Sequence, residues 1–417
     1  MSKIRIKNFG PIRRGFSENE GWLDVKKVTI FIGNQGSGKS SVAKLISTFS
    51  WIEKALTRGD FDIKWFTKNS KFRKNYCSYH RIENYFLDVN GDDKAQIGYI
   101  GDSFSMNYNN GKLSIEESET GDYQLPQIMY VPSERSFIST IKSPRLLKLS
   151  SDSLIEFLTE FDNAKLELKD SLRLPINNTN LDYDKLNDII NIQGNDYRVR
   201  LTEASSGFQS AVPLYLVSWF LANSIKNQRK SNLEPMSSDE LSRFKKGVAE
   251  IWSNNNLTDD QKRVAISVLS SRFNKTAFIN IVEEPEQNLF PSSQRDMLNS
   301  LLDFNNLNED NKLIITTHSP YIITFLSIAI QAQYLKSLAK VKGKYDEQVR
   351  SKINQIVPEN SMIESKDVVI YQLDETNGSI KKLDSFEGIP SDKNYLNEIL
   401  KEGNLLFDGL LEIEQGL

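Results

Sequence analysis

A glycine-rich segment near the N-terminus has the residue types and spacing needed to bind the phosphates of a nucleotide. It runs from Gly33 to Ser40 and fits the pattern G-x-x-x-x-G-K-[ST]. An apolar, β-branched run at 28–32 precedes it, and apolar residues at helical spacing follow from 41 onward. Glycines let the backbone curl so that N–H groups face phosphate oxygens, and a helix N-terminus adds partial positive charge. We therefore expect a phosphate-binding loop between a buried strand and a helix.

Individual residues of this loop have separate expected roles. Lys39 should reach the β- and γ-phosphates of ATP, and the hydroxyl of Ser40 should ligate Mg²⁺. The residues expected to contact the nucleotide are Gly33, Asn34, Gln35, Gly36, Ser37, Gly38, Lys39, Ser40 and Ser41. The alternative is a glycine-rich turn with a chance lysine, and the patterns on both flanks argue against it.

A second apolar run, at 276–282, ends in Glu283-Glu284-Pro285-Glu286. Carboxylates at the end of a buried strand are costly unless a metal or a proton partner compensates them. Next to a phosphate-binding loop, Glu283 can hold the water shell of Mg²⁺, and Glu284 can orient or deprotonate the attacking water. A solvated acidic turn is the alternative, and the phosphate-binding loop upstream disfavours it.

Two further residues follow strands that should end at the same edge of a sheet, where α/β proteins place their ligands. His318 comes after the apolar run 312–317, and we expect it to touch the γ-phosphate rather than serve a structural role. Arg135 comes shortly after the run 127–131. It could sense the γ-phosphate or pair with Glu134 in a turn, and the sequence leaves both possibilities open.

A serine- and glycine-containing segment precedes an apolar helical pattern at 211–222. It contains Ser205, Ser206, Gly207 and Gln209. Such residues at a helix start can form an anion-binding cradle. Serine is also an ordinary helix N-cap, so the segment is a weak indication by itself.

The stretch 64–81 carries six basic residues and no acidic one, with five aromatic residues among them. Basic and aromatic side chains together can bind phosphates and stack on bases, which would make this stretch a nucleic-acid contact. The alternative, which we favour, is a solvated basic face whose aromatic rings point inward.

Composition bounds the class of protein. The chain has 417 residues, a net charge of −3, one cysteine and two histidines, so it can form neither an internal disulfide framework nor a histidine- and cysteine-based zinc site. A single cysteine fits a reducing cytosol. No signal-peptide pattern begins the chain, and the apolar runs 213–222 and 321–330 are too short to span a bilayer. We expect a cytoplasmic protein without membrane contact.

The order of the patterns predicts an α/β fold with a mixed sheet. Recurrent turn signals between 85 and 131 predict an antiparallel β-subdomain, and the polar, charged segment 223–275 predicts an inserted helical lobe. We expect an ATPase domain at 1–335 and a C-terminal extension at 336–417, which contains a hairpin and an amphipathic, mostly acidic final helix.

Taken in order, these motifs resemble the ABC-type ATPase heads of the SMC, RecF and OLD superfamily. The likeness spans roughly residues 1–330 and rests on the phosphate-binding loop, the Ser205–Gln209 signature, the Glu283–Glu286 end of the Walker B strand and the segment around His318. Tyr130–Arg135 and Glu284–Pro291 are most similar to the stand-alone ATPases of bacterial anti-phage operons, in particular those of the PARIS type.

The resemblance implies ATP and Mg²⁺ as ligands and at least a homodimer, with a higher oligomer expected. Ser206 and Gly207 of one chain would face the γ-phosphate bound by the other. It further implies a viral anti-restriction protein as trigger and a Toprim-type nuclease as effector, which is expected on a separate chain because no Toprim pattern follows the ATPase motifs. Glu283 replaces the usual aspartate, which favours a water-bridged metal contact. The alternatives are a RecF-like DNA repair or recombination ATPase and the ATPase subunit of a transporter.

Overall fold

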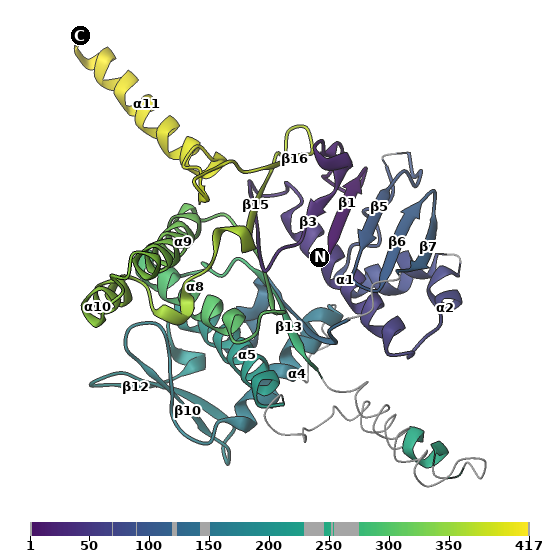
Figure 1. Cartoon of the computed structure of the whole chain (residues 1–417), viewed down its shortest axis with the longest axis horizontal. Coiled ribbons are helices and arrows are strands. Elements are labelled where there is room, and N and C mark those ends of the chain that lie inside the picture. The colour runs from purple at the N-terminus through teal and green to yellow at the C-terminus, as the bar shows by residue number, and fades with distance from the viewer. Residues whose placement is uncertain are drawn as a thin grey trace.

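The computed structural model describes residues 2–68, 70–88, 90–118, 123–141, 151–228, 246–251, 253 and 275–415. Within these residues, a seven-stranded sheet lies at the centre, with antiparallel sheets of five and four strands on its flanks (Figure 1). Helices separate the sheets. The predicted α/β fold with a mixed sheet is confirmed.

The central sheet is parallel over most of its width. Its strands, in spatial order, are β2 (Gly15–Phe16), β16 (Ser379–Lys382), β15 (Val368–Leu373), β4 (Val28–Gly33), β14 (Lys312–Thr317), β13 (Ala277–Glu283) and β8 (Pro126–Val131). The five strands from β15 to β8 run parallel to one another, and β16 runs antiparallel to β15. These parallel strands are almost wholly buried, which explains their near-continuous apolar sequences.

Two hydrophobic clusters cover the two faces of the central sheet. Alternate residues of β4 contribute to each, so that Ile30 packs in one cluster and Phe31 in the other. The helix α1 (Lys39–Thr57) packs on the Phe31 side, between the central and five-stranded sheets. The other face is covered by α4 (Asp152–Glu167), α5 (Ser206–Gln228), α8 (Pro291–Asn306) and α9 (Pro320–Val341).

The five-stranded antiparallel sheet has the order β3 (Leu23–Asp24), β1 (Lys3–Lys7), β5 (Gln96–Ile100), β6 (Phe104–Asn109) and β7 (Lys112–Glu117). The turns expected near 101–102 and 109–111 join β5 to β6 and β6 to β7. The predicted subdomain boundary at 131 differs from the structure, because β8 pairs parallel to β13 in the central sheet. All six residues from 126 to 131 are buried, as expected for a strand of that sheet.

Shorter elements connect these layers. They are α2 (Ile63–Thr67), α3 (Ser136–Thr140), β9 (Leu172–Arg173), β10 (Asn180–Asp184), β11 (Ile189–Gln193) and β12 (Arg198–Arg200). The four strands from β9 to β12 form an antiparallel sheet whose Leu181 and Ile192 are fully buried in the cluster shared with α4 and α5. Of the predicted helical lobe at 223–275, residues 223–228 are the end of α5, and most of the remainder lies outside the described residues.

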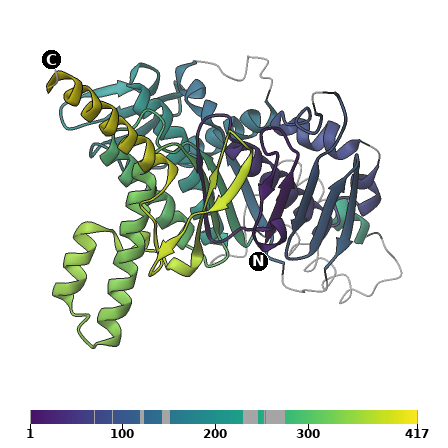
Figure 2. The ribbon, with the colours of Figure 1, turned by 90° about the horizontal axis from the view of Figure 1, so that it is seen from above.

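The C-terminal part is not a separate extension of the ATPase sheet. The boundary expected at 335 falls inside α9, and the hairpin of β15 and β16 lies in the central sheet, where β15 pairs with β4. After α9 come α10 (Glu347–Ile356), the short hairpin β17 (Ser385–Phe386) and β18 (Ile389–Pro390), and the final helix α11 (Tyr395–Gln415). Figure 2 shows α9 and α10 as a projecting helical pair.

The helix α9 is long and apolar enough to cross a membrane by length and composition. The apolar run at 321–330, expected to be too short, therefore lies in a longer helix. Six residues of its N-terminal part are buried in the protein core, and they are Ile322, Ile323, Leu326, Ala329, Ile330 and Ala332. Burial accounts for the apolar character of these six residues, whereas only 33% of the most apolar window of the helix is buried.

If β15 belongs to the same cooperative unit as the phosphate-binding loop, Ile370→Ala should destabilise the whole molecule. Ile370 packs in the cluster that contains Val28, Ile30 and Ile32. Its truncation is expected to lower the free energy of unfolding by about 2–5 kcal/mol. Urea unfolding followed by circular dichroism should show one transition at a lower midpoint. The matched control is Leu186→Ala, at a side chain that is 97% exposed, with an effect within about 0.5 kcal/mol. A separate transition that alone responds to Ile370→Ala would contradict a single unit.

Candidate active site

The phosphate-binding loop connects β4 to α1, as expected. Two of its glycines are required by conformation and by space. Gly33 has φ 147° and Gly38 has φ 102°, values that favour glycine. A Cβ atom at Gly33 would lie 2.4 Å from the carbonyl oxygen of Leu373, and one at Gly38 would lie 2.7 Å from Cγ1 of Ile12. Gly38 is the N-cap of α1 and supplies no side-chain cap, so the first helical N–H groups are available to an anion.

Lys39 is buried at the first position of α1. Its Nζ donates to the carbonyl oxygens of Gly33 at 3.0 Å and Asn34 at 2.9 Å. Burial lowers the pKa of Lys39 from 10.5 to about 8, while four nearby carboxylates act in the opposite direction. Among these carboxylates, Glu284 raises the pKa of Lys39 most. The side chain is thus held over the loop with its charge only partly stabilised, a setting in which added phosphate oxygens would be favourable.

The two glutamates after β13 have different surroundings. Glu283 is 4% exposed, and its Oε2 accepts a hydrogen bond from the backbone N–H of Ser133 at 3.1 Å. Its Oε1 is buried and forms no hydrogen bond of good geometry among the described residues, and the buried hydroxyl of Tyr130 lies beside this carboxylate. Glu284 is more exposed, and its Oε1 lies 3.6 Å from Nε2 of His318. The close contact with His318 is the largest effect lowering the pKa of Glu284, so its carboxylate is ionised at neutral pH.

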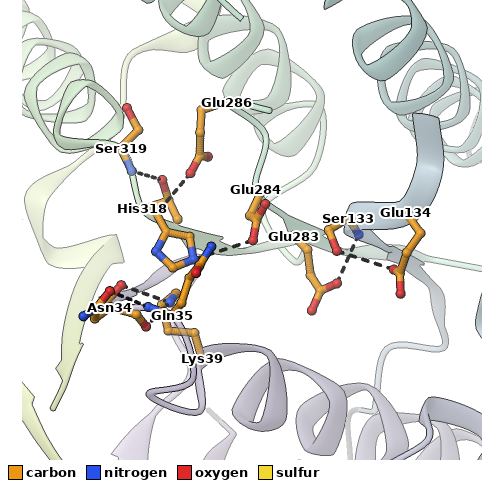
Figure 3. Close-up of polar contacts among 12 residues, drawn as sticks. Asn34, Gln35, Lys39, Ser133, Glu134, Glu283, Glu284, Glu286, His318 and Ser319 are labelled. Carbon is orange, nitrogen blue, oxygen red and sulfur yellow. Dashed lines mark hydrogen bonds and ion pairs between the residues drawn. The ribbon is translucent and has the colours of Figure 1, made fainter. Parts of the chain in front are cut away.

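Backbone strain fixes where Glu284 points. Its φ is +45°, a conformation that residues with a Cβ rarely adopt. Its N–H donates to the carbonyl of Thr316 at 2.8 Å, which ties the turn to the end of β14. In Figure 3, the side chains of Glu283, Glu284, His318 and Lys39 form one group at the sheet edge above the phosphate-binding loop.

Glu286 connects this turn to the segment around His318, a role that the sequence analysis did not assign. Its Oε1 accepts the backbone N–H of His318 at 2.7 Å (Figure 3). Burial raises the pKa of Glu286, although the hydrogen bond from His318 acts against the rise. The signal was present in the sequence, because Glu286 belongs to the same acidic run. Its partner, 32 residues away, could only be found from the register of β13 and β14.

Arg135 occupies neither of the two positions expected for it. Its side chain is fully buried, and Glu134 instead forms an ion pair with Arg81 at 2.8 Å. The guanidinium donates to the carbonyl oxygens of Glu283 and Glu284 at 2.6 Å each. It also donates to those of Pro132 at 3.2 Å and Ser210 at 3.1 Å. With four of its five N–H donors engaged in this way, Arg135 is a positioning residue that joins the strained turn to α5.

The Ser205–Gln209 segment lies at the start of α5. Ser205 and Ser206 are exposed, and a Cβ atom at Gly207 would lie 2.9 Å from the carbonyl oxygen of Asn288. Among the described residues, no hydrogen bond joins this segment to the phosphate-binding loop of the same chain. Gln209 does not face an open site, since its Nε2 donates to the carbonyls of Leu201 and Thr202.

The basic and aromatic stretch 64–81 has two buried rings among its five, and the other three are exposed or partly exposed. Phe66 and Phe72 are buried, and Tyr76 accepts a hydrogen bond from Nε1 of Trp65 at 2.7 Å. Trp65 remains 39% exposed, with Nζ of Lys71 2.9 Å from its ring centroid. Phe66 and Phe72 point inward as the favoured alternative expects, and a nucleic-acid contact at this stretch stays a prediction because three rings keep exposed surface.

The sheet edge suits Mg²⁺ and ATP. The buried Oε1 of Glu283, which forms no hydrogen bond of good geometry, needs a cation, a proton or a water molecule, and the hydroxyl of Ser37 is also buried without a partner among the described residues. Ser40 and Glu283 are the residues that would hold Mg²⁺, directly or through water. The loop from Gly33 to Ser41 supplies N–H groups and Lys39 to the phosphates.

Comparison with known protein families finds a match to a short part of the chain. Residues 261–323 match the model of the AAA ATPase domain, and this segment includes Glu283, Glu284 and His318. Among curated proteins, none matches the chain.

Several solved structures resemble the chain weakly. The SMC head domain from Thermotoga maritima is 10% identical with a TM-score of 0.34, covering 92% of this chain and 98% of that one. An SMC head from Pyrococcus furiosus, bound to the C-terminal domain of ScpA, is 11% identical with a TM-score of 0.35, covering 92% and 96%. A dimeric ATP-binding cassette bound to ADP and phosphate is 12% identical with a TM-score of 0.26, covering 93% and 100%. TM-scores of this size transfer neither a fold nor a function.

If Arg135 positions the turn that carries Glu284, Arg135→Lys should slow ATP turnover more than it weakens ATP binding. A lysine keeps the charge but cannot reach four carbonyl oxygens, so we also expect a loss of about 2–4 kcal/mol in stability. The measurement is kcat and KM at a temperature where circular dichroism shows the variant folded. The control is Arg81→Lys, whose exposed ion pair with Glu134 should contribute at most about 1 kcal/mol. An unchanged kcat would show that Arg135 supports stability alone.

The lowered pKa of Lys39 predicts how ATP affinity depends on pH. Below pH 8 the ammonium group is charged and ready to bind phosphate. Above pH 8 the free protein must take up a proton on binding, so affinity should fall by up to about tenfold per pH unit. Titration calorimetry from pH 7.5 to 9.5 measures this slope. Lys39→Ala should lose tight binding, and its residual affinity should be flat over the same range. A flat profile for the natural protein would show that Lys39 does not contact the phosphates.

Proposed function

We propose that this chain binds Mg·ATP at the carboxyl edge of its central sheet and hydrolyses it. The observation that carries this proposal is the meeting of Lys39, Glu284 and His318 from three separate strand ends beside the buried carboxylate oxygen Oε1 of Glu283. The match of residues 261–323 to the AAA ATPase domain supports it from the sequence.

The proposed chemistry assigns one role to each residue. Bound Mg²⁺ would neutralise charge on the phosphates. Lys39 would stabilise negative charge on the β- and γ-phosphates, and the ionised carboxylate of Glu284 would orient the attacking water and accept its proton. His318, 3.6 Å from Glu284, would hold that carboxylate and contact the γ-phosphate. Catalysis of this kind depends on positioning and electrostatics, which the clamp by Arg135 and the strained φ of Glu284 would provide.

We propose further that two copies cooperate in closing the site. Ser206 and Gly207 lie exposed or half-exposed at the N-terminus of α5, where backbone N–H groups are available to an anion. In such a pair they would face the γ-phosphate held by the second copy. Arg135 contacts both α5 and the turn of Glu284, and would thereby connect closure of the pair to the catalytic carboxylate.

The cellular role that the sequence favours is phage defence in the cytoplasm. The segments Tyr130–Arg135 and Glu284–Pro291 resemble those of AriA, the ATPase of the PARIS system. We propose that the chain is the sensor and scaffold subunit of such a complex. It would hold a separate Toprim-type nuclease and release it when a viral anti-restriction protein is detected.

Glu284→Gln provides the test of hydrolysis and a bait for the partner. The variant should retain ATP and slow turnover by about 10²–10⁴, the range for loss of a general base. Glu134→Gln, on the neighbouring loop, is the matched control and should hydrolyse ATP normally. Near-normal turnover in Glu284→Gln would overturn the assignment of the base.

The same tagged variant, expressed from its own operon, should recover a nuclease chain by native purification and mass spectrometry. Lys39→Ala serves as the comparison that cannot hold ATP tightly. Recovery of a Toprim-type nuclease in a large, slowly hydrolysing complex is the expected result. A lone dimer whose ATPase rate rises with DNA would contradict the defence role and favour a RecF-like one.

A further inference from the structure

The final helix α11 exposes a large apolar surface. None of its described side chains is buried, and it runs outward from the body of the molecule (Figure 1). Its exposed apolar residues are Ile399, Leu400, Leu405, Leu406, Phe407, Leu410, Leu411 and Ile413, with exposed fractions between 38% and 70%. Apolar surface of this extent on one element indicates an interaction site.

Four of the eight exposed apolar residues of α11 share one face of the helix. Ile399, Leu406, Leu410 and Ile413 are separated by seven, four and three residues, which places them on one face. At about 100° per residue, Glu402 lies at one edge of this stripe, and Glu414 lies between it and a second apolar row of Leu400, Phe407 and Leu411. The helix carries five acidic residues and one lysine, a net charge of −4. A surface that covers α11 should therefore be apolar at its centre and basic around it.

The projecting pair of α9 and α10, which we call the helical hairpin, has that character. Its exposed apolar side chains include Tyr334 at 54%, Val341 at 87% and Ile356 at 67%. Residues 336–352 contain six basic and two acidic residues, a net charge of +4. Glu359 pairs with Lys336 and Arg350. Of the remaining lysines, Lys340 lies over the ring of Tyr345, and Lys342, Lys344 and Lys352 form no ion pair within the described part of the chain.

We propose that α11 of one copy packs on the helical hairpin of a second copy, and that the exchange is reciprocal. Opposite charges and exposed apolar side chains on both surfaces support a second copy of this chain, rather than another protein, as the occupant. Both elements lie at the same end of the molecule in the two views, away from the five-stranded sheet (Figures 1 and 2). No hydrogen bond or ion pair joins α11 to the hairpin of its own chain among the described residues. In a two-fold symmetric dimer, the α11 helix of each copy would pack on the helical hairpin of the other.

The base of α11 is tied to the phosphate-binding loop. The hydroxyl of Tyr395 donates to Oε1 of Glu375 at 2.9 Å, and the same oxygen accepts Nδ2 of Asn34 at 3.0 Å. The backbone N–H of Tyr395 donates to Oε1 of Gln372 at 2.9 Å. The carboxylate of Glu375 thus connects the first residue of α11 to the phosphate-binding loop. A second copy bound to α11 would be linked to the loop by these contacts, whether or not the chain hydrolyses ATP.

A membrane is the competing occupant of an amphipathic helix. Helices that lie on bilayers are rich in lysine and arginine on their polar face, and anionic lipids attract them. The polar face of α11 is acidic, so anionic lipid would repel it. This difference in charge makes vesicle binding a separate outcome of the test.

The test exchanges charge between the two surfaces in the full-length chain, without nucleotide. One variant carries Glu398→Lys, Glu402→Lys and Glu414→Lys on α11. The other carries Lys342→Glu, Lys344→Glu and Lys352→Glu on the helical hairpin. Each alone should associate at least about tenfold more weakly than the natural protein in sedimentation velocity, because like charges then face each other. An equimolar mixture should associate again, since each altered arm meets an altered hairpin of opposite charge.

The matched control is Glu116→Lys with Glu117→Lys, two exposed residues at the end of β7 in the five-stranded sheet, which should associate normally. Circular dichroism and ATPase rate establish that every variant is folded. The proposal is overturned if the natural protein is monomeric without nucleotide, if either variant associates as the natural protein does, or if the mixture fails to associate. Monomers that sediment with phosphatidylcholine and phosphatidylglycerol vesicles would instead show that the exposed apolar helices, α9 or α11, bind lipid. Because nucleotide is absent, failure here leaves the proposed ATPase activity untouched.

Discussion

The parallel register of the central sheet is the constraint on which the candidate site depends. Because β4, β13, β14 and β15 run in the same direction, their carboxyl ends meet at one edge. Glu283 pairs with Thr316, Thr317 with Ile32, and Leu373 with Gly33. Segments separated by hundreds of residues are thereby brought within hydrogen-bonding distance. Residues that come directly after the ends of these strands are therefore close to one another in space.

Arg135 converts this arrangement into a fixed geometry. Glu284 sits at a positive φ, and such a conformation persists only where the surroundings determine it. Its N–H is held by Thr316 and its carbonyl by the guanidinium of Arg135. The same guanidinium binds the carbonyl of Ser210 in α5. Arg135 therefore links α5 directly to the backbone of Glu284, so a displacement of α5 would move the turn that carries Glu284.

Two buried cations, Lys39 and Arg135, interact with the carboxylates at this edge. Lys39 is surrounded by the carboxylates of Glu283, Glu284, Glu286 and Glu375, which offset part of the cost of burying its charge. Glu284 stays ionised beside His318, whereas burial raises the pKa of Glu286. Neighbouring carboxylates in one acidic run thus differ in protonation tendency, which suits a base next to a structural acceptor. Glu375 extends this network to the base of α11.

The sequence by itself determined the local chemistry. The spacing from Gly33 to Ser40, with its flanking strand and helix, predicted the phosphate-binding loop, because this motif depends on neighbouring residues alone. The acidic run at 283–286 and His318 were found for the same reason, since each ends a strongly apolar strand. The tertiary structure decided what depends on distant pairing. In the structure β8 belongs to the central sheet rather than to the predicted antiparallel subdomain. The pairing of β15 with β4 places Glu375 beside the loop. The tertiary structure also gave Arg135 four backbone acceptors, because carbonyl positions after β13 and in α5 cannot be read from residue types. Local conformation is encoded by short patterns, whereas register and the partners of buried polar groups are set only when the whole sheet has assembled.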